Sequence, residues 1–476
     1  MLASETMPLV AERFDLVVLG GGSAARDGAN MAMRDYDARV ALVERVRWGG
    51  SCPNVACSPT KAYLVAAELA HDLSSRAPVI GIETGPARVD LARVRAWKES
   101  LKKTQEQWVR DLEGAGLATF SEQATFTGPH TLRVGERELE ADRILIATGS
   151  RTAVPPVEGI DEIDWLDHVS ALDLTEVPRS LLVVGCGAVG LEFGQMFARF
   201  GAQVRLVDAS ERIAPLADGE ASATLAAALH DEGIELAANV LVQRVRQDGD
   251  EVTATIAPRD GSEPYERRAE RVLLASGRVP NVEELGLEAA GVETTRSGIT
   301  VDEHLRTSAP GIWAAGDVTA VAQFTPIAQY QARIAVDDMF GKDAKAADYS
   351  VLPTAIFTEP ELAGVGLTEQ EAREQEIEHE VVTHDMKYIQ RASYKDQKRG
   401  LYKIVFETGT RRVLGLHVVA PNGSDIVQGF AIGLRLGVTI DDLARMHHAF
   451  PTFGEGVKAA AEQAMPQPVE MAAICN

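Results

Sequence analysis

A chain of 476 residues, 45% of them hydrophobic, is long enough for about three domains, each with a core of its own. No apolar run approaches the roughly 20 residues that span a bilayer, so the sequence predicts no membrane partner. The chain has a formal charge of −23, whereas binding to a phosphate backbone requires an excess of basic residues. Nucleic acid is therefore excluded as an expected partner.

The first predicted strand, FDLVVLG at 14–20, runs directly into a glycine turn. The turn reads Gly20-x-Gly22-x-x-Ala25 and precedes a stretch of helical character, not a small-residue cleavage site. Together with only four cysteines in the chain, this predicts a cytoplasmic protein without a secretion signal. The next strand, RVALVE, ends at Glu44, 24 positions after Gly20, a spacing that suits a carboxylate accepting from a ribose hydroxyl.

The same pattern recurs in LLVVGCGAVGLEFG, which contains Gly185-x-Gly187-x-x-Gly190. The following strand, QVRLVD, ends at Asp208, 23 positions after Gly185. Each copy also has a third apolar strand, RILIATG at 143–149 and RVLLASG at 271–277. Because small residues let backbone amides at a helix N-terminus approach a pyrophosphate, the repeat predicts two dinucleotide sites.

The rest of the chain divides at about Val351. Before it, TSAPGIWAAGDV places Asp317 after a small-residue turn, which alone could be any carboxylate that follows a strand. After it, the strand-like pieces GLYKIVF and VLGLHVV and amphipathic helices at about 424–436 and 440–447 indicate an α+β domain. The predicted domains are 1–152 with 281–348 for the first nucleotide site, 153–280 for the second, and 349–476 at the C-terminus.

The segment WGGSCPNVACSPTK contains Cys52 and Cys57. A zinc site needs about four ligands, and neither Cys186 in the second glycine turn nor Cys475 near the C-terminus forms a second pair, so no bound metal is predicted. Two unrelated buried thiols are a further alternative. On a straight helix the two α-carbons would lie roughly 8–9 Å apart, beyond the roughly 7 Å limit for a disulfide, so a bonded pair requires a bend. The prolines of the segment favour such a bend, and we interpret the pair as a redox dithiol.

GGSCPNVACSPTK resembles the active-site signature of the class I flavoprotein disulfide reductases, the pyridine nucleotide-disulfide oxidoreductases. Their common form is Gly-Gly-Thr-Cys-x-Asn-x-Gly-Cys-x-Pro-Ser-Lys, from which this chain departs at Ser51, Ala56 and Thr60. The likeness extends from Phe14 to about Gln463. It implies an α/β fold with two Rossmann-like dinucleotide-binding domains, for FAD and NAD(P), plus a C-terminal α+β dimerisation domain. It also implies a homodimer in which that domain completes the partner's active site.

The resemblance further implies a role for each motif. Hydride would pass from NAD(P)H to FAD, the flavin would reduce a Cys52–Cys57 disulfide, and the dithiol would reduce an external acceptor. Cys57 would lie against the flavin ring, Cys52 would face the substrate, and Lys61, paired with Glu192, would lie near the flavin N5. The implied FAD residues are Gly20, Gly22, Ala25, Glu44, Gly50, Lys61, Thr148, Gly149, Gly316 and Asp317. The implied NAD(P) residues are Gly185, Gly187, Gly190, Asp208 and Gly277, and since Asp208 repels a 2′-phosphate, NADH is favoured over NADPH.

One position departs from the disulfide-reducing members, which carry a His-Pro-Thr-x-x-Glu stretch whose imidazole moves a proton. Here the stretch is HHAFPTFGEG, with Phe450 before the proline. His447 and His448 lie three and two residues earlier, so either needs a shifted backbone to substitute. Glu455 remains as a candidate catalytic residue, although Thr452-x-x-Glu455 is also typical of a capping box.

Mercuric reductases characteristically lack this histidine, and VVAPNGSDIVQGFAIGLRLGVTIDDLA resembles their C-terminal domain. Those enzymes carry a tyrosine near position 450 and two adjacent tail cysteines, where this chain has Phe450 and Cys475 alone. The favoured hypothesis is a mercuric reductase-like oxidoreductase that acts on a metal ion or on an unusual disulfide or thiol adduct. The alternatives are a dihydrolipoamide dehydrogenase or other disulfide reductase that uses His448, and a flavin-based redox sensor with little turnover.

Overall fold

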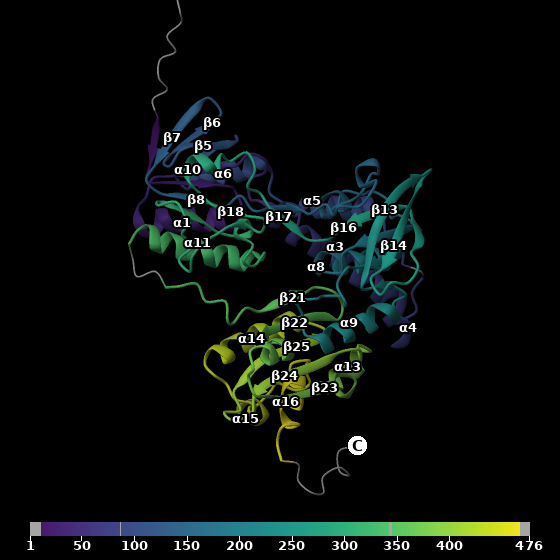
Figure 1. Ribbon diagram of the computed structural model, residues 1–476. Helices are drawn as coiled ribbons and strands as arrows, with labels where there is room; N and C mark the ends of the chain where they lie inside the picture. The colour runs from purple at the N-terminus through teal and green to yellow at the C-terminus, as the bar shows by residue number, and fades with distance from the viewer. Residues whose placement is uncertain (1–10, 86, 342–344, 467–476) are drawn as a thin grey trace, which may run out of the picture. The chain divides into compact units, whose positions relative to one another are not determined.

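The computed structural model describes residues 11–85, 87–341 and 345–466 (Figure 1). The chain forms two compact units. The first takes its residues from Met1–Thr60, Trp97–Ala153 and Arg278–Asp348, and the second from Lys61–Ala96, Val154–Gly277 and Tyr349–Asn476. The assignment of one cofactor to each predicted nucleotide domain stays a prediction.

A five-stranded parallel sheet organises the first unit, with the order β20-β8-β2-β3-β4. Its strands are short apolar runs buried on both faces, as parallel strands usually are. Leu16 and Val18 face helices α1 and α11, which lie side by side in Figure 1, whereas Val17 and Leu19 face a second sheet of order β1-β7-β6-β5. The bounds are β2 Leu16–Leu19, β3 Val40–Val43, β4 Ala118–Phe120, β8 Ile144–Ile146, β20 Ile312–Ala314, α1 Ser23–Tyr36 and α11 Thr325–Met339.

The smaller elements of the first unit surround these layers. The second sheet consists of β1 Glu12–Phe14, β5 Ala124–Gly128, β6 Thr131–Val134 and β7 Arg137–Ala141. Two-stranded sheets pair β9 Ser150–Thr152 with β17 Arg278–Pro280, and β18 Thr294–Thr295 with β19 Gly298–Ile299. The helices are α2 Ser51–Asn54, α6 Gln105–Gly114, α10 Leu287–Ala290 and the 3-10 turn η3 Asp317–Thr319, while α5 Leu91–Ser100 crosses from one unit to the other.

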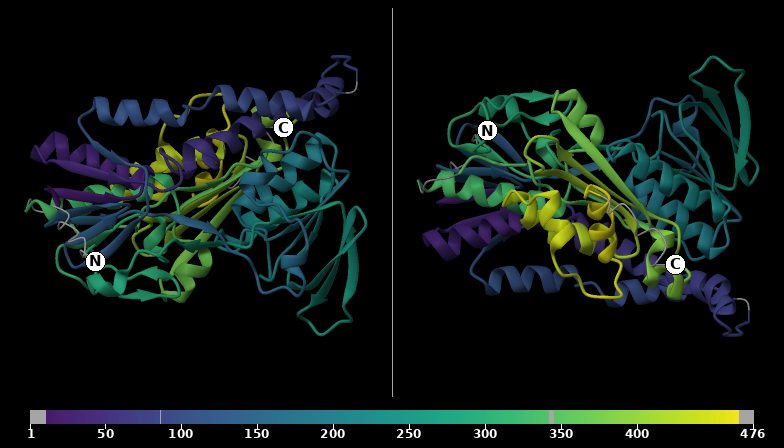
Figure 2. Two further views of the ribbon diagram at one scale, coloured as in Figure 1. Left: turned by 90° about the horizontal axis from the view of Figure 1, so that it is seen from above. Right: turned by 90° about the horizontal axis from the view of Figure 1, so that it is seen from below.

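The second unit repeats the strand, glycine turn and helix pattern in a parallel sheet of order β12-β11-β10-β16. Its bounds are β10 Ser180–Val184, α8 Ala188–Phe200, β11 Gln203–Val207, α9 Gly219–Asp231, β12 Glu235–Ala237 and β16 Arg271–Leu274. A three-stranded antiparallel sheet follows β12, with hairpins that project outward in both views of Figure 2. It comprises β13 Val240–Asp248, β14 Glu251–Pro258 and β15 Tyr265–Ala269.

The C-terminal part of this unit is an antiparallel sheet of order β21-β22-β25-β24-β23. Helix α14 contacts β22 and β25, and α16 contacts β23 and β24, so the sheet buries a core of its own. The strands are β21 Thr354–Ile356, β22 Glu361–Gly366, β23 His379–Asp385, β24 Leu401–Glu407 and β25 Val413–Ala420. The helices are α12 Glu369–Glu374, η4 Met386–Tyr388, α13 Gln390–Lys395, α14 Gly423–Arg435, α15 Ile440–Arg445 and α16 Glu455–Glu462.

The remaining elements of the second unit precede β10. They are α3 Cys57–His71, the π-helix η1 Asp72–Arg76, α4 Ala77–Val79, the 3-10 turn η2 Ile160–Glu162 and α7 His168–Ala171. The predicted α/β class with two nucleotide-type sheets and an α+β C-terminal part is confirmed. Within the described residues, none of the helices combines the length and apolarity required to cross a membrane.

Candidate active site

The two cysteines of the signature segment lie on either side of a break between two helices. Helix α2 ends at Asn54, Val55 leaves the helical conformation with φ −142° and ψ −1°, and α3 begins at Cys57. The buried Asn54 amide holds the break by donating to the carbonyls of Trp48 at 2.9 Å and Gly50 at 2.7 Å. The bend predicted between the cysteines is therefore confirmed, while their pairing as a disulfide stays a prediction.

The two thiols differ in their surroundings. Cys52 is half-buried and interacts electrostatically with Arg26, whereas Cys57 is exposed and its Sγ lies 3.7 Å from the hydroxyl of Thr325 at the start of α11. Cys57 also begins an α-helix, where unpaired amides favour a thiolate. A thiol at this point is placed to act as a nucleophile or to meet a bound ring.

The predicted Lys61–Glu192 ion pair forms in the second unit. The Nζ of Lys61 donates to Oε2 of Glu192 at 2.7 Å, and the backbone amide of Phe357 donates to Oε1 at 3.0 Å. Glu192 is buried, while the Lys61 side chain keeps 37% of its surface exposed. An ammonium held on one side by a buried carboxylate and accessible on the other suits a group that stabilises developing negative charge.

The first glycine turn has the shape of a dinucleotide cradle. Gly22 is the N-cap of α1 without a side-chain cap, so the first amides of the helix remain for a ligand. Gly50 approaches this turn so closely that a Cβ on it would lie 2.4 Å from the α-carbon of Gly22, which no side chain permits. Ala25 is fully buried in the first turn of the helix. These small residues leave room for a pyrophosphate, and their assignment to FAD stays a prediction.

Glu44 has capacity left for a ribose hydroxyl. Its Oε2 accepts from the amide of Gly21 at 2.7 Å, and its Oε1 accepts from Val46 at 2.7 Å and Arg47 at 3.0 Å. An ionised carboxylate has about four acceptor sites, so these three amides orient Glu44 and leave about one site on Oε2. The predicted role of Glu44 fits this geometry.

Asp317 is held by two residues that the sequence did not single out. Its Oδ2 accepts from the hydroxyl of Ser150 at 2.6 Å and lies 3.5 Å from Nε of Arg278. Arg278 in turn donates to the Ser150 hydroxyl at 2.7 Å and to the Ser150 carbonyl at 2.8 Å. Both described contacts use Oδ2, which leaves Oδ1 for a ribityl hydroxyl. The signal for Arg278 was its place directly after Gly277, at the end of an apolar strand.

The remaining predicted FAD residues lie in the same unit. The hydroxyl of Thr148 donates to the carbonyl of Asn281 at 2.7 Å, and Gly149 follows with φ +71°. The amide of Gly316 donates to Oε1 of the buried Gln331 at 2.7 Å. Each of these residues terminates a strand of the parallel sheet or follows one, where ligands of such sheets bind.

The second glycine turn, which the sequence assigns to NAD(P), repeats the geometry of the first. Gly187 is the N-cap of α8 without a side-chain cap, and a Cβ there would meet nothing within 4 Å. At Gly190 a Cβ would lie 1.8 Å from the carbonyl oxygen of Gly185, so this glycine allows the helix to pack onto its own turn. Gly277 lies three residues after the end of the third strand, β16, and has φ +120°. The turn therefore packs closely at Gly190 and leaves open space at Gly187, the N-cap of α8.

Asp208 lies at the end of β11 with both carboxylate oxygens already oriented. Oδ2 accepts from the amide of Cys186 at 2.5 Å and Oδ1 from that of Ser210 at 2.7 Å, leaving about two acceptor sites for ribose hydroxyls. The guanidinium of Arg212 instead donates to the carbonyls of Pro215 and Ala217 at 3.0 Å each. Arg212 is thus engaged in its own turn.

In the C-terminal segment, Phe450 occupies the position at which disulfide-reducing members carry a histidine. Phe450 is 72% exposed. His448 is half-buried, and among the described residues its buried Nε2 has no hydrogen-bond partner; burial lowers the pKa of this imidazole. His447 is exposed, and Cys475 lies outside the described residues.

The capping-box interpretation of this segment is confirmed for one of its two bonds, that from the Thr452 amide to the Glu455 carboxyl, and is wrong for the N-cap. The N-cap of α16 is Gly454 without a side-chain cap, and the hydroxyl of Thr452 donates to the carbonyl of Ala449 at 2.8 Å. Glu455 begins the helix, and its carboxyl accepts from the amides of Thr452 and Gln390 while burial raises its pKa. The reason is that a 3-10 turn at 453–456 starts the helix later than the sequence pattern indicates.

Comparisons with known proteins agree with this arrangement. The family model of the pyridine nucleotide-disulphide oxidoreductases matches residues 14–332, and the model of their dimerisation domain matches residues 352–461. The chain belongs to this family. Membership implies FAD and NAD(P)H as cofactors and makes the chain a flavoprotein disulfide oxidoreductase, which confirms the predicted resemblance.

Individual relatives fall on more than one branch of the family. A mercuric reductase of Staphylococcus aureus is 35% identical over 94% of this chain and 82% of its own length. A dihydrolipoyl dehydrogenase of Thermus scotoductus is 34% identical over 96% of this chain and 99% of its own length. The Cu(II) complex of the HOCl-induced flavoprotein disulfide reductase RclA from Escherichia coli superposes with a TM-score of 0.85 at 28% identity, covering 95% of this chain and all of that one.

Proposed function

We propose that this chain is an NADH-dependent, FAD-containing oxidoreductase of the mercuric reductase-like branch, which reduces a soft metal ion or an unusual disulfide or thiol adduct at Cys52 and Cys57. Oxidation of one NADH releases two electrons. That is the number needed to open one disulfide to two thiols or to reduce one divalent ion to its zero-valent state. Two thiolates also form a preferred ligand set for a soft ion as substrate.

The observation that carries the proposal is Phe450. A disulfide reductase must protonate a leaving thiolate, and a phenyl ring cannot supply a proton. His448, the nearest substitute, is half-buried, and burial lowers the pKa of its imidazole. A metal ion held by two thiolates requires no such proton transfer. The names of the mercuric reductase relatives and of the Cu(II) complex support the same reading.

The chain's own residues divide the work in this proposal. The chemistry that bound FAD supplies is two-electron transfer from the reduced nicotinamide to the cysteine pair. Gly22, Gly50, Glu44 and Asp317 would hold that cofactor by its pyrophosphate, ribose and ribityl groups. Lys61, fixed by Glu192, would place a positive charge where negative charge develops.

NADH is the proposed reductant because of the carboxylate at Asp208. It would accept from a 2′-hydroxyl and repel a 2′-phosphate. The Nη2 of Arg212 donates to two carbonyls of its own turn, which supports this choice, since that nitrogen is already engaged. The dimerisation-domain match supports a homodimer, and the three-domain division with its cytoplasmic location belongs to the same proposal.

A disulfide reductase is the second candidate, because dihydrolipoyl dehydrogenases match this chain over nearly its whole length. It requires His448 to act as the acid in place of a histidine at position 450. A flavin-based redox sensor is the third, and it is distinguished by reduction without turnover.

One experiment separates the three. The purified enzyme is titrated anaerobically with NADH and with NADPH, and the reduced form is then offered Hg(II), Cu(II), lipoamide and low-molecular-weight disulfides. Rapid reoxidation by a metal ion supports the proposal. Rapid reoxidation by lipoamide that is lost in His448→Ala supports the second candidate, and a reducible enzyme without any acceptor supports the sensor.

A further inference from the structure

Three buried polar side chains lie along one face of helix α8. Glu192, Gln195 and Arg199 are spaced by three and four residues, so they share one side of the helix. Glu192 is 5% and Gln195 is 2% exposed, and the Arg199 side chain is 5% exposed. Buried polar groups are costly unless they are hydrogen-bonded, so this face of the helix must bind a polar partner.

The partner is the backbone between β21 and β22. Gln195 accepts from the amide of Glu359 at 2.8 Å and donates to the carbonyl of the same residue at 2.7 Å. Two residues earlier, the amide of Phe357 donates to Glu192 at 3.0 Å. The polar face of α8 therefore fixes the position of residues 357–359 through their main chain.

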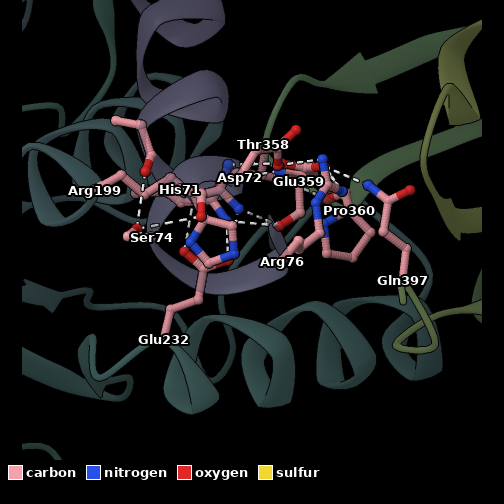
Figure 3. A network of polar contacts seen from close by, with 12 residues as sticks. His71, Asp72, Ser74, Arg76, Arg199, Glu232, Thr358, Glu359, Pro360 and Gln397 are labelled. Atoms are coloured by element: carbon pink, nitrogen blue, oxygen red, sulfur yellow. Dashed lines mark hydrogen bonds and ion pairs between the residues drawn. The ribbon is translucent and has the colours of Figure 1, made fainter. Parts of the chain in front are cut away.

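The side chain of Glu359 is fixed as well. Figure 3 shows Arg199, Arg76 and Gln397 directed toward its carboxylate, and the bonds measure 2.7, 2.9 and 2.5 Å. Arg199 also pairs with Glu232 through two bonds of 2.8 and 2.9 Å. The nearby positive charges, chiefly Arg199, outweigh burial and hold the pKa of Glu359 below its usual value. With this many partners, the 357–359 segment has little freedom to move on α8.

The consequence of this anchoring appears at Phe357. Its ring centroid lies 4.2 Å from Nζ of Lys61, the same ammonium that donates to Glu192. Both partners of Lys61 are thereby tied to one backbone segment, Glu192 through the Phe357 amide and the ring through the Phe357 side chain. A long lysine side chain held by a carboxylate alone keeps several rotamers, whereas a ring on a second side restricts them.

We infer that Phe357 is a positioning residue for Lys61, and that Gln195 acts through Phe357 to keep the ammonium at a single place. The inference rests on the proposed function, in which Lys61 stabilises charge that develops during hydride transfer. It adds the Phe357 ring and the buried Gln195 amide to the Lys61–Glu192 pair. Neither residue takes part in a chemical step.

The test compares Phe357→Leu with the matched control Phe357→Tyr, which keeps an aromatic ring. In each purified protein, the rate of acylation of Lys61 by a small activated ester is measured by mass spectrometry. Lys103 serves as the internal reference, since its Nζ also lies near a carboxylate, Asp111 at 2.7 Å, and a ring, Trp108 at 4.9 Å. We expect the Lys61 to Lys103 ratio to rise about two- to fivefold in Phe357→Leu and to stay unchanged in Phe357→Tyr. Equal ratios in all three proteins would overturn the inference.

A second readout connects the position of Lys61 to its work. Rapid-mixing measurements should show flavin reduction by NADH slowed about two- to fivefold in Phe357→Leu, with the NADH concentration at half saturation unchanged. A reduction rate equal to that of the unmodified enzyme would overturn the catalytic part of the inference. Gln195→Ala should change the acylation ratio and the flavin reduction rate in the same directions as Phe357→Leu. A Gln195→Ala protein with native values of both would remove Gln195 from the inference. A chain that neither binds flavin nor oxidises NADH would sink the proposed function instead, because the acylation comparison does not depend on turnover.

Discussion

Replacing Gly187 by alanine should weaken the binding of the nicotinamide cofactor without lowering the stability of the fold. The backbone of Gly187 has φ −79° and ψ −172°, an extended conformation that alanine adopts without strain. Among residues 11–85, 87–341 and 345–466, a Cβ at this position meets nothing within 4 Å. The added methyl group therefore enters only the space in front of α8, where the pyrophosphate is expected to approach the helix amides.

The size of each effect follows from these contacts. Alanine in place of glycine restricts the unfolded chain and stabilises by about 0.4–1 kcal/mol, while alanine is a poorer N-cap than glycine by a similar amount, so the melting temperature should change by less than about 3 °C. Losing one hydrogen bond to a charged group costs about 1.5–3 kcal/mol. The Kd for NAD⁺, which shares this pyrophosphate, should therefore rise about 10- to 100-fold.

Isothermal titration calorimetry of the oxidised enzyme with NAD⁺, which has no hydride to transfer, measures the affinity, and a thermal melt measures the stability. Gly190→Ala is the contrasting variant, because its Cβ would lie 1.8 Å from the Gly185 oxygen and must displace backbone. That variant should lose several degrees of melting temperature. An affinity for NAD⁺ within twofold of that of the unmodified enzyme in Gly187→Ala, or a melting temperature lowered by more than about 5 °C, would refute the assignment of this turn.

Further predictions concern the thiols, the reductant and the C-terminal segment. Two-electron reduction should produce a long-wavelength absorption band from thiolate-to-flavin charge transfer. Cys57→Ser should abolish this band, whereas Cys52→Ser should show it without reductant. A band retained in Cys57→Ser would reverse the two roles. Asp208→Ala should raise kcat/KM for NADPH relative to NADH by more than about tenfold, since it removes one repelling charge, and an unmodified enzyme that already prefers NADPH would contradict this. Lipoamide should be turned over slowly and faster in Phe450→His, because a positioned acid contributes about 10²–10⁴ in rate; turnover of lipoamide by the unmodified enzyme near the general median of about 10 s⁻¹ would disprove the idea.

Local patterns in the chain predicted the architecture well. The two glycine turns, the strands that precede them and the helices that follow depend on neighbouring residues, so periodicity and small residues were sufficient signals. The break between Cys52 and Cys57 was equally predictable, since five helical residues cannot bring two α-carbons within disulfide reach. The start of α16 was not, because the competition between Gly454 and Thr452 for the helix cap depends on where the preceding turn runs.

The partners that orient the candidate site are long-range contacts, and no local signal encodes them. Phe357 follows Glu192 by 165 positions, and Arg278 follows Ser150 by 128. In the sequence, Phe357 and Gln195 are an ordinary aromatic residue and an ordinary amide, since propensity and spacing describe only neighbours along one element. Their roles arise when packing buries one face of α8, because each buried donor and acceptor must then find a partner wherever the fold places one.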